Sequence, residues 1–167
     1  MKGEQWQQAL GLLAEMRSVN LLPDAIAYGA VISACEKGEQ WQQALGLLAE
    51  MRSAGVLPHV VTYNAAISAC EKGEQWQQAL GLLPEMRSVG VLPNVFTYTA
   101  AISACDKGKQ SQQALEILAE MRSVSVLPDV MTYNAAIRAC EKGEQLQQAL
   151  GLLAEMRKIG ALPVVIT

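Results

Sequence analysis

The stretch Val60–Asn94 reads VVTYNAAISACEKGEQWQQALGLLPEMRSVGVLPN, and its pattern decides the fold. The same stretch returns every 35 residues with few changes. A period of about 20–50 residues is typical of proteins that stack one small structural unit. Residues 1–24 form the end of an earlier copy, 25–59, 60–94, 95–129 and 130–164 are complete copies, and 165–167 begin a later one. We therefore predict a single repeat array, and we expect the natural protein to be longer because both ends cut through a copy.

Each copy contains two short amphipathic helices. We predict the first over about Val61–Glu71 and the second over about Gln75–Arg87, with a turn between them. Gly90 and Pro93 end the second helix, because glycine favours a left-handed cap and proline cannot continue a helix. A pair of such helices cannot bury its apolar face alone, so neighbouring pairs must stack. We predict an all-α fold, a right-handed α-solenoid of stacked antiparallel helix–turn–helix repeats.

Composition and charge limit the classes of function. Hydrophobic residues make up 51% of the 167 residues, which argues against a disordered chain. No apolar run approaches the roughly 18 residues that a membrane helix needs, so we expect no membrane partner. The net charge of −3 has the wrong sign for bulk electrostatic binding to nucleic acid. A nucleic-acid surface would therefore need its basic groups gathered on one face, with the acids elsewhere.

The first helix of each copy has two different faces. Tyr63 and Ile67 share one side at helical spacing, with Cys70 on the same side, and we predict that this side is buried. The opposite side carries one apolar, one amide, one hydroxyl and one cationic side chain: Val61, Asn64, Ser68 and Lys72. This stripe is the candidate binding surface.

Three places vary from copy to copy while most of the scaffold repeats. The second residue of the copies is Ile26, Val61, Phe96, Met131 and Ile166. The fifth is Gly29, Asn64, Thr99 and Asn134, and the last is Asp24, His59, Asn94, Asp129 and Val164. Some scaffold places vary too, since the second helix begins with Trp6, Trp41, Trp76, Ser111 or Leu146. A uniform scaffold with variable side chains along one stripe suits a module that reads a linear polymer, one repeat to one monomer.

The TYN segment, the AL pair, the EM that follows it and the Gly-Val-Leu-Pro-Asn ending resemble the pentatricopeptide repeat over the whole chain. This resemblance implies sequence-specific binding of single-stranded RNA, with one base read per repeat by two or three side chains. It also implies a role in organellar RNA processing, stability or translation, in the mitochondrion or plastid. The sequence enters the repeat pattern directly at its start, so we expect any targeting leader to have been removed or to lie outside this sequence. We expect no cofactor and no small-molecule substrate.

The resemblance further assigns roles to individual positions. The fifth and last residues would contact the base edge: Gly29, His59, Asn64, Asn94, Thr99, Asp129, Asn134 and Val164. The second residues, Ile26, Val61, Phe96, Met131 and Ile166, would flank the base, and Lys37, Lys72, Lys107 and Lys142 would meet phosphates. By the family's code Asn64 with Asn94 implies a pyrimidine, with C favoured, Thr99 with Asp129 implies G, and Asn134 with Val164 a loose pyrimidine preference. Gly29 with His59 fits no standard pair, so the implied RNA is 5′-N-(C/U)-G-(U/C)-3′.

Each of these roles has a purely structural alternative. Asp24, Asn94 and Asp129 directly precede a helix, where Asp and Asn are favoured N-caps. The lysines follow acidic residues, so they could simply be solvated: Glu36, Glu71, Asp106 and Glu141. The tryptophans are expected to pack between helix pairs and not to stack on bases.

No catalytic or metal site is predicted. Cys35, Cys70, Cys105 and Cys140 are 35 residues apart, unlike the closely spaced cysteines of zinc sites, and we expect small buried residues in a reducing compartment. The single histidine, His59, and the lack of a glycine-rich phosphate loop or paired carboxylates argue against an enzyme.

Two other functions are compatible with the sequence. The acidic pI near 5.2 suits a helical-repeat scaffold for protein or peptide partners, like the related 34-residue tetratricopeptide arrays. The near identity of the copies also allows a relic of recent duplication with no selected ligand.

Overall fold

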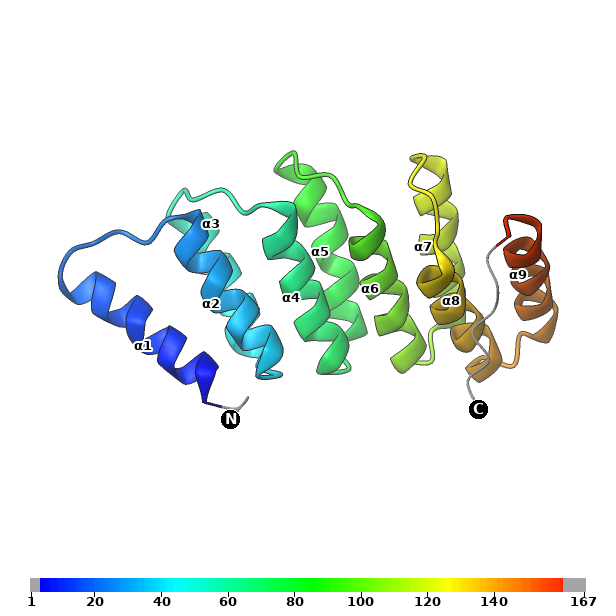
Figure 1. Cartoon of the computed structure of the whole chain (residues 1–167), viewed down its shortest axis with the longest axis horizontal. Helices are drawn as coiled ribbons and strands as arrows, with labels where there is room; N and C mark the ends of the chain where they lie inside the picture. Colours follow the sequence, from blue (N-terminus) through cyan, green and yellow to red (C-terminus); the bar gives the residue numbers. More distant parts are fainter. Residues whose placement is uncertain (1–3, 161–167) are drawn as a thin grey trace. The chain divides into compact units, whose positions relative to one another are not determined.

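The structure is a computed structural model that describes residues 4–160, and this part of the chain is all-α, without strands (Figure 1). The helices are α1 (Gln5–Ser18), α2 (Ala25–Lys37), α3 (Trp41–Ser53), α4 (Val60–Lys72), α5 (Trp76–Ser88), α6 (Val95–Lys107), α7 (Ser111–Ser123), α8 (Val130–Lys142) and α9 (Leu146–Lys158). Both helices of the quoted copy, α4 and α5, lie within about one residue of their predicted ends. Across residues 4–160 no helix has the length and apolar character that crossing a membrane requires.

Contacts divide the chain into two compact units, Met1–Leu92 with α1 to α5 and Pro93–Thr167 with α6 to α9. In the first unit α2 packs against α3 and α4, and α4 also packs against α3 and α5. In the second unit α6 packs against α7 and α8, and α8 also packs against α7 and α9. Within each unit the first helices of neighbouring pairs therefore lie side by side, and each second helix also contacts the next first helix. We call the two helices of one copy a hairpin.

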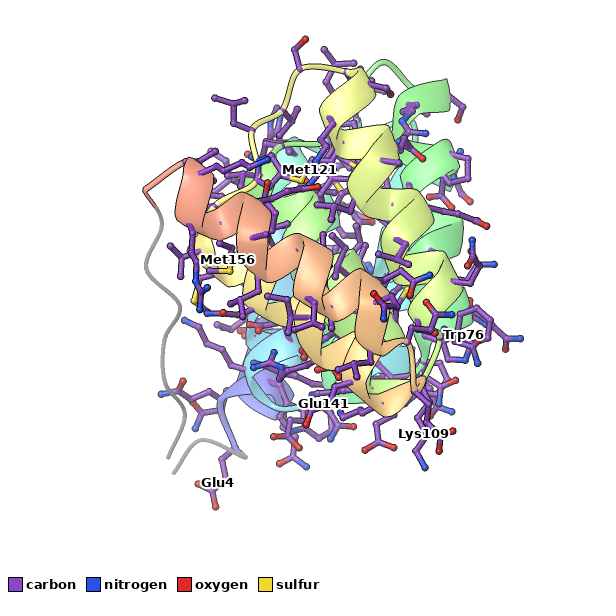
Figure 2. All side chains as sticks on the ribbon, turned by 90° about the vertical axis from the view of Figure 1, so that its right-hand side faces the viewer. Glu4, Trp76, Lys109, Met121, Glu141 and Met156 are labelled. Carbon is purple, nitrogen blue, oxygen red and sulfur yellow. The ribbon has the colours of Figure 1, made fainter. Side chains whose placement is uncertain are left out.

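The predicted core face is buried. Tyr63, Ile67 and Cys70 are each 0% exposed, so the periodicity of the first helix identified its buried side correctly. The second helices contribute methionines, among them Met121 of α7 and Met156 of α9 (Figure 2), both also 0% exposed. A buried side chain of this size contributes about 1.5–3 kcal/mol of transfer free energy. Stacking of hairpins is thus the main source of stability.

The second helices end as predicted, in the left-handed backbone region. Gly90 has a φ of 80°, and Asn20 and Ser125 take the same region at 58° and 62°. Glycine has no Cβ atom and asparagine is the next most common residue in this region, so Ser125 is the least suited of these residues.

The turn inside each hairpin uses glycine for a different reason. Gly73 has a φ of −82°, whereas the next residue, Glu74, takes the left-handed conformation with a φ of 56°. A Cβ atom on Gly73 would lie 2.3 Å from Cδ1 of Trp41, which belongs to the preceding hairpin. Gly38 meets Trp6 in the same way. These contacts show that Trp6 and Trp41 pack between hairpins, as predicted, and that the glycine makes room for the indole ring.

Ion pairs join the second helices of successive hairpins. Arg52 Nη1 lies 2.7 Å from Glu85 Oε1, and Arg17 pairs with Glu50 in the same manner. Each of these glutamates also accepts a hydrogen bond from the buried tyrosine of its own hairpin. The Tyr28 hydroxyl donates to Glu50 Oε1 at 2.9 Å. Several of the chain's acids are thus used to join hairpins and do not form a general negative surface.

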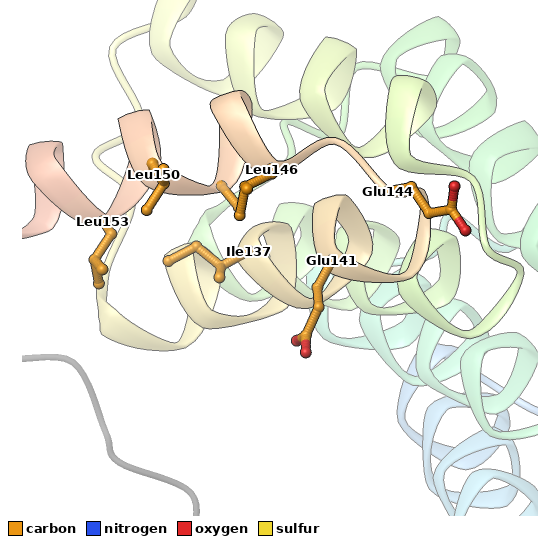
Figure 3. Close-up of a pocket in the computed structure, with 7 residues that line it drawn as sticks. Ile137, Glu141, Glu144, Leu146, Leu150 and Leu153 are labelled. Atoms are coloured by element: carbon orange, nitrogen blue, oxygen red, sulfur yellow. The ribbon is translucent and has the colours of Figure 1, made fainter.

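The last described hairpin leaves its stacking face open (Figure 3). Ile137, Leu146, Leu150 and Leu153 line an apolar hollow of about 450 Å³ between α8 and α9. One repeat earlier, Ile102 and Leu118 occupy the places of Ile137 and Leu153 and are 0% and 1% exposed, because α8 covers α6 and α7. The hollow therefore lies on the face that α8 covers one repeat earlier.

This difference in burial predicts unequal effects of the same substitution. Ile102→Ala removes fully buried methyl groups and should cost about 2–5 kcal/mol of unfolding free energy. Ile137→Ala, at the equivalent place on the half-buried face, should cost clearly less. Urea unfolding followed by circular dichroism measures both, and equal losses would contradict the packing described.

The tryptophan contact gives a second stability prediction. Gly73→Ala should destabilise the protein by about 1–3 kcal/mol, because the new methyl group displaces Trp41. Gly46→Ala is the matched control, since Gly46 lies on the same helix as Trp41 and its Cβ would meet nothing within 4 Å. That control should stabilise the protein by about 0.5–1 kcal/mol through helix propensity. Thermal melts that shift in the same direction for both variants would exclude the proposed role of Gly73.

Candidate nucleic-acid interface

The second residue of each copy is an exposed apolar side chain on the first helix. Ile26 and Val61 in the first unit are 79% and 68% exposed, and Phe96 and Met131 in the second unit are 71% and 63% exposed. A single exposed apolar residue needs no explanation, but recurrence at one helical position marks a shared surface. Because α2 lies beside α4 and α6 beside α8, each unit presents a pair of these side chains. Ile166 lies outside the described residues.

The fifth and last residues frame the same surface. Gly29, Asn64, Thr99 and Asn134 are half-buried. Among the last residues, Asp24, His59 and Asp129 are exposed and Asn94 is half-buried, while Val164 lies outside the described residues. In the second unit the structure brings Thr99 and Asp129 together through Thr132, whose hydroxyl oxygen lies 2.8 Å from Thr99 Oγ1 and 2.9 Å from Asp129 Oδ1.

The helix-capping alternative holds for three of the last residues. Asp24 accepts a hydrogen bond from the backbone N–H of Ala27 at 2.9 Å, and Asp129 Oδ1 accepts one from Thr132 at 2.9 Å. Asn94 caps α6 in the same way, whereas His59 makes no side-chain cap. In Asp129 the cap uses Oδ1, and within residues 4–160 no hydrogen bond involves Oδ2. Capping therefore leaves one carboxylate oxygen to face a ligand.

The lysines of the stripe differ in their surroundings. Lys72 Nζ lies 2.6 Å from Glu36 Oε1, a carboxylate of the preceding hairpin that also accepts from the Ser68 hydroxyl at 3.0 Å. Lys107 is exposed. Lys37 is also exposed, and no ion pair of it occurs among residues 4–160. At Lys72, acid and base thus lie on the same surface.

The second unit repeats this pairing with more charge. Lys142 Nζ lies 2.8 Å from Asp106 Oδ1, and Arg138 Nε lies 3.1 Å from Oδ2 of the same carboxylate, which is 5% exposed. The separation of acids from bases that a nucleic-acid surface would need therefore does not occur at these positions. A phosphate that approached Lys72 or Lys142 would compete with a carboxylate that already holds the lysine.

The cysteines are buried thiols, as predicted: Cys35, Cys70, Cys105 and Cys140. Burial raises the pKa of Cys70 to about 11 and that of Cys105 to about 12, so both stay protonated at neutral pH. A protonated thiol is a poor nucleophile and a poor metal ligand. The described residues contain no group of three potential metal ligands.

Two features of this surface were not predicted from the sequence. The first is the bridging hydroxyl of Thr132, for which a signal existed: threonine occupies the third place in three of the four complete copies, as Thr62, Thr97 and Thr132. The second is the pairing of Lys72 with Glu36 and of Lys142 with Asp106, each with an acid 36 residues earlier. The two residues of each pair are one 35-residue period plus one residue apart, so they meet only when neighbouring first helices lie side by side.

Comparison with known proteins identifies the repeat. A PPR repeat family model matches residues 23–72, a PPR repeat model matches 61–91 and 131–160, and a pentatricopeptide repeat domain model matches 81–143. A search of curated protein sequences finds no match.

Several solved structures share the fold. The pentatricopeptide repeat protein PPR10 from maize is 31% identical to this chain, with a TM-score of 0.72. The match covers 98% of this chain and 23% of the PPR10 chain. The complex of PPR10 with an 18-nt psaJ RNA element is 21% identical over 91% of this chain and 22% of that one, with a TM-score of 0.75. The PPR domain of Arabidopsis thaliana protein-only RNase P 1 in complex with tRNA is 16% identical over 96% and 84%, with a TM-score of 0.84.

The chain spans less than a quarter of the PPR10 chain. The matched family models adjoin or overlap one another and together extend from residue 23 to residue 160. These models cover most of the described hairpins, and the hairpin fold agrees with that of the solved relatives. The chain belongs to the pentatricopeptide-repeat family.

Proposed function

We propose that this chain is a single-stranded RNA-binding module in which each repeat reads one base. The observation that carries the proposal is the recurring exposed apolar residue at the second place of the first helices, beside the polar fifth and last residues. RNA binding is supported at the level of the family, since similar repeat structures were determined with a psaJ RNA element and with tRNA.

The second unit gives the most complete reading site. Phe96 and Met131 project from neighbouring helices α6 and α8, and apolar side chains of this kind pack against the faces of unstacked bases. Thr99 and Asp129 supply hydroxyl and carboxylate oxygens for the edge of the same base. A base inserted between the apolar pair would be held by stacking and identified by hydrogen bonds.

By the family's code the preferred RNA is 5′-N-(C/U)-G-(U/C)-3′, and we place its function in organellar RNA processing, stability or translation. Lys37, Lys72, Lys107 and Lys142 are proposed to meet phosphates, and Lys37 is exposed without an ion pair to any of residues 4–160. Lys72 and Lys142 would do so only after exchange with Glu36 and Asp106. Binding should therefore depend more on base contacts than is usual for basic RNA-binding domains.

A second candidate function is a scaffold for protein or peptide partners. The observation in its favour is the pairing of Lys72 and Lys142 with carboxylates, which lowers the positive charge available to RNA. A pull-down that recovers the same protein partners after ribonuclease treatment would favour the scaffold. Loss of partners after the treatment would favour RNA.

The sequence preference can be tested by titration. An RNA that contains CCGU should bind at least about fivefold more tightly than a permuted RNA of equal composition, a difference of about 1 kcal/mol. Fluorescence anisotropy at one stated low salt concentration measures both affinities, since RNA binding weakens as salt rises. Equal affinities would refute base reading, and absence of binding to either RNA would refute the RNA function.

The ion-paired lysines give a second prediction. Asp106→Asn should release Lys142 and Arg138 for phosphates, so RNA should bind more tightly. The slope of log affinity against log salt concentration should become steeper by about 0.7 for each added phosphate contact. Glu155→Gln is the matched control, because it makes the same charge change on the second helices, where Glu155 pairs with Arg122. If the two variants change the salt slope equally, the effect comes from net charge and not from the stripe.

A further inference from the structure

The hydroxyl of Thr132 joins the two residues that are proposed to read one base. Thr132 is 0% exposed and belongs to α8, the first helix of the next repeat, so it cannot contact RNA itself. We propose that Thr132 is a positioning residue that fixes the proton of Thr99 and thereby makes this site select guanine. This inference rests on the RNA-binding function proposed above.

The hydrogen bonds around Thr132 determine where each proton lies. Its Oγ1 accepts from the backbone N–H of Asp129 at 3.2 Å and donates to Asp129 Oδ1 at 2.9 Å. The carboxylate has no proton to give, so the single proton of Thr132 is used for this charge-assisted bond. Thr99 Oγ1 lies 2.8 Å from Thr132 Oγ1 and must therefore be the donor of that contact.

The consequence is a surface that can only accept hydrogen bonds. The one proton of Thr99 points inward to Thr132, so its outward lone pairs face the ligand. Asp129 Oδ2, on the carboxylate bonded to the same threonine, is a second acceptor. Guanine offers two adjacent donors on its Watson–Crick edge, N1–H and the N2 amino group. Adenine, cytosine and uracil each place an acceptor next to their donor there, so the acceptor pair favours guanine.

The first unit contains the same buried threonine without this arrangement. Thr62 is 3% exposed and occupies the same place in its copy as Thr132. The fifth residue of the preceding copy is Gly29, however, and it has no hydroxyl. The last residue there is His59, which makes no side-chain cap. An added Cβ on Gly29 would lie 3.4 Å from Thr62 Oγ1, an ordinary contact distance, so a side chain can be accommodated. The chain therefore supplies its own comparison site.

Substitution of Thr132 should change discrimination between bases more than affinity. In Thr132→Val the proton of Thr99 is free to turn outward toward adenine N1, so the preference for CCGU over CCAU should fall about fivefold, the effect of roughly one hydrogen bond. Thr132→Ser keeps the hydroxyl and should keep the preference. Thr62→Val is the matched control, because it removes a buried hydroxyl that has no Thr99 counterpart, and it should leave the ratio unchanged.

Anisotropy titrations of both RNAs against each variant, with melting curves to check folding, give distinguishable outcomes. If the wild type prefers CCGU and Thr132→Val keeps the full preference, this inference is wrong while the proposed function stands. If the wild type binds neither RNA, or binds both equally, base reading by this chain fails and the inference fails with it.

A gain-of-function variant keeps the inference testable if Thr132→Val does not fold. Gly29→Thr combined with His59→Asp rebuilds the hydroxyl and carboxylate beside Thr62. This double variant should acquire a preference for GCGU over ACGU, and addition of Thr62→Val should remove it. A preference that survives Thr62→Val would overturn the role assigned to the buried threonine.

Discussion

Burial of the apolar face between neighbouring hairpins is the constraint on which the rest of the structure depends. One hairpin has too little apolar surface on its own, so Ile32 and Met51 become fully buried where α4 packs over α2 and α3, and Ile102 and Met121 where α8 packs over α6 and α7. Stacking places first helices beside first helices, and it does so with a fixed register because the copies are nearly identical. The regular spacing of the variable stripe is thus a by-product of core packing.

The same register explains how polar groups are paired. Trp41 reaches Gly73, Lys72 reaches Glu36 and Thr99 reaches Thr132, and each contact joins two consecutive hairpins. Polar contacts between hairpins add direction to an apolar interface that would otherwise tolerate sliding. The acidic composition is consistent with this arrangement, since acids such as Glu36, Glu50 and Asp106 are engaged between repeats.

The sequence predicted the helices, the buried face and the packing role of tryptophan, because these depend on periodicity within one copy. It predicted the reading residues only through resemblance to a family, and that assignment stays a prediction. Contacts between copies could not be predicted in the same way. Glu36 and Lys72 are 36 residues apart, and whether they meet depends on the side-by-side placement of α2 and α4. The separation of acids from bases that a nucleic-acid surface would need does not occur at Lys72 and Lys142 for this reason.

The central claim is that RNA meets the first helices along the stripe of second, fifth and last residues. Mapping of amide chemical shifts by NMR during addition of CCGU RNA tests it most directly. The account predicts changes around Phe96, Thr99 and Asn134 on α6 and α8, with little change along the outer residues of α7 and α9. Changes concentrated on α7 and α9, with none around Thr99, would contradict it.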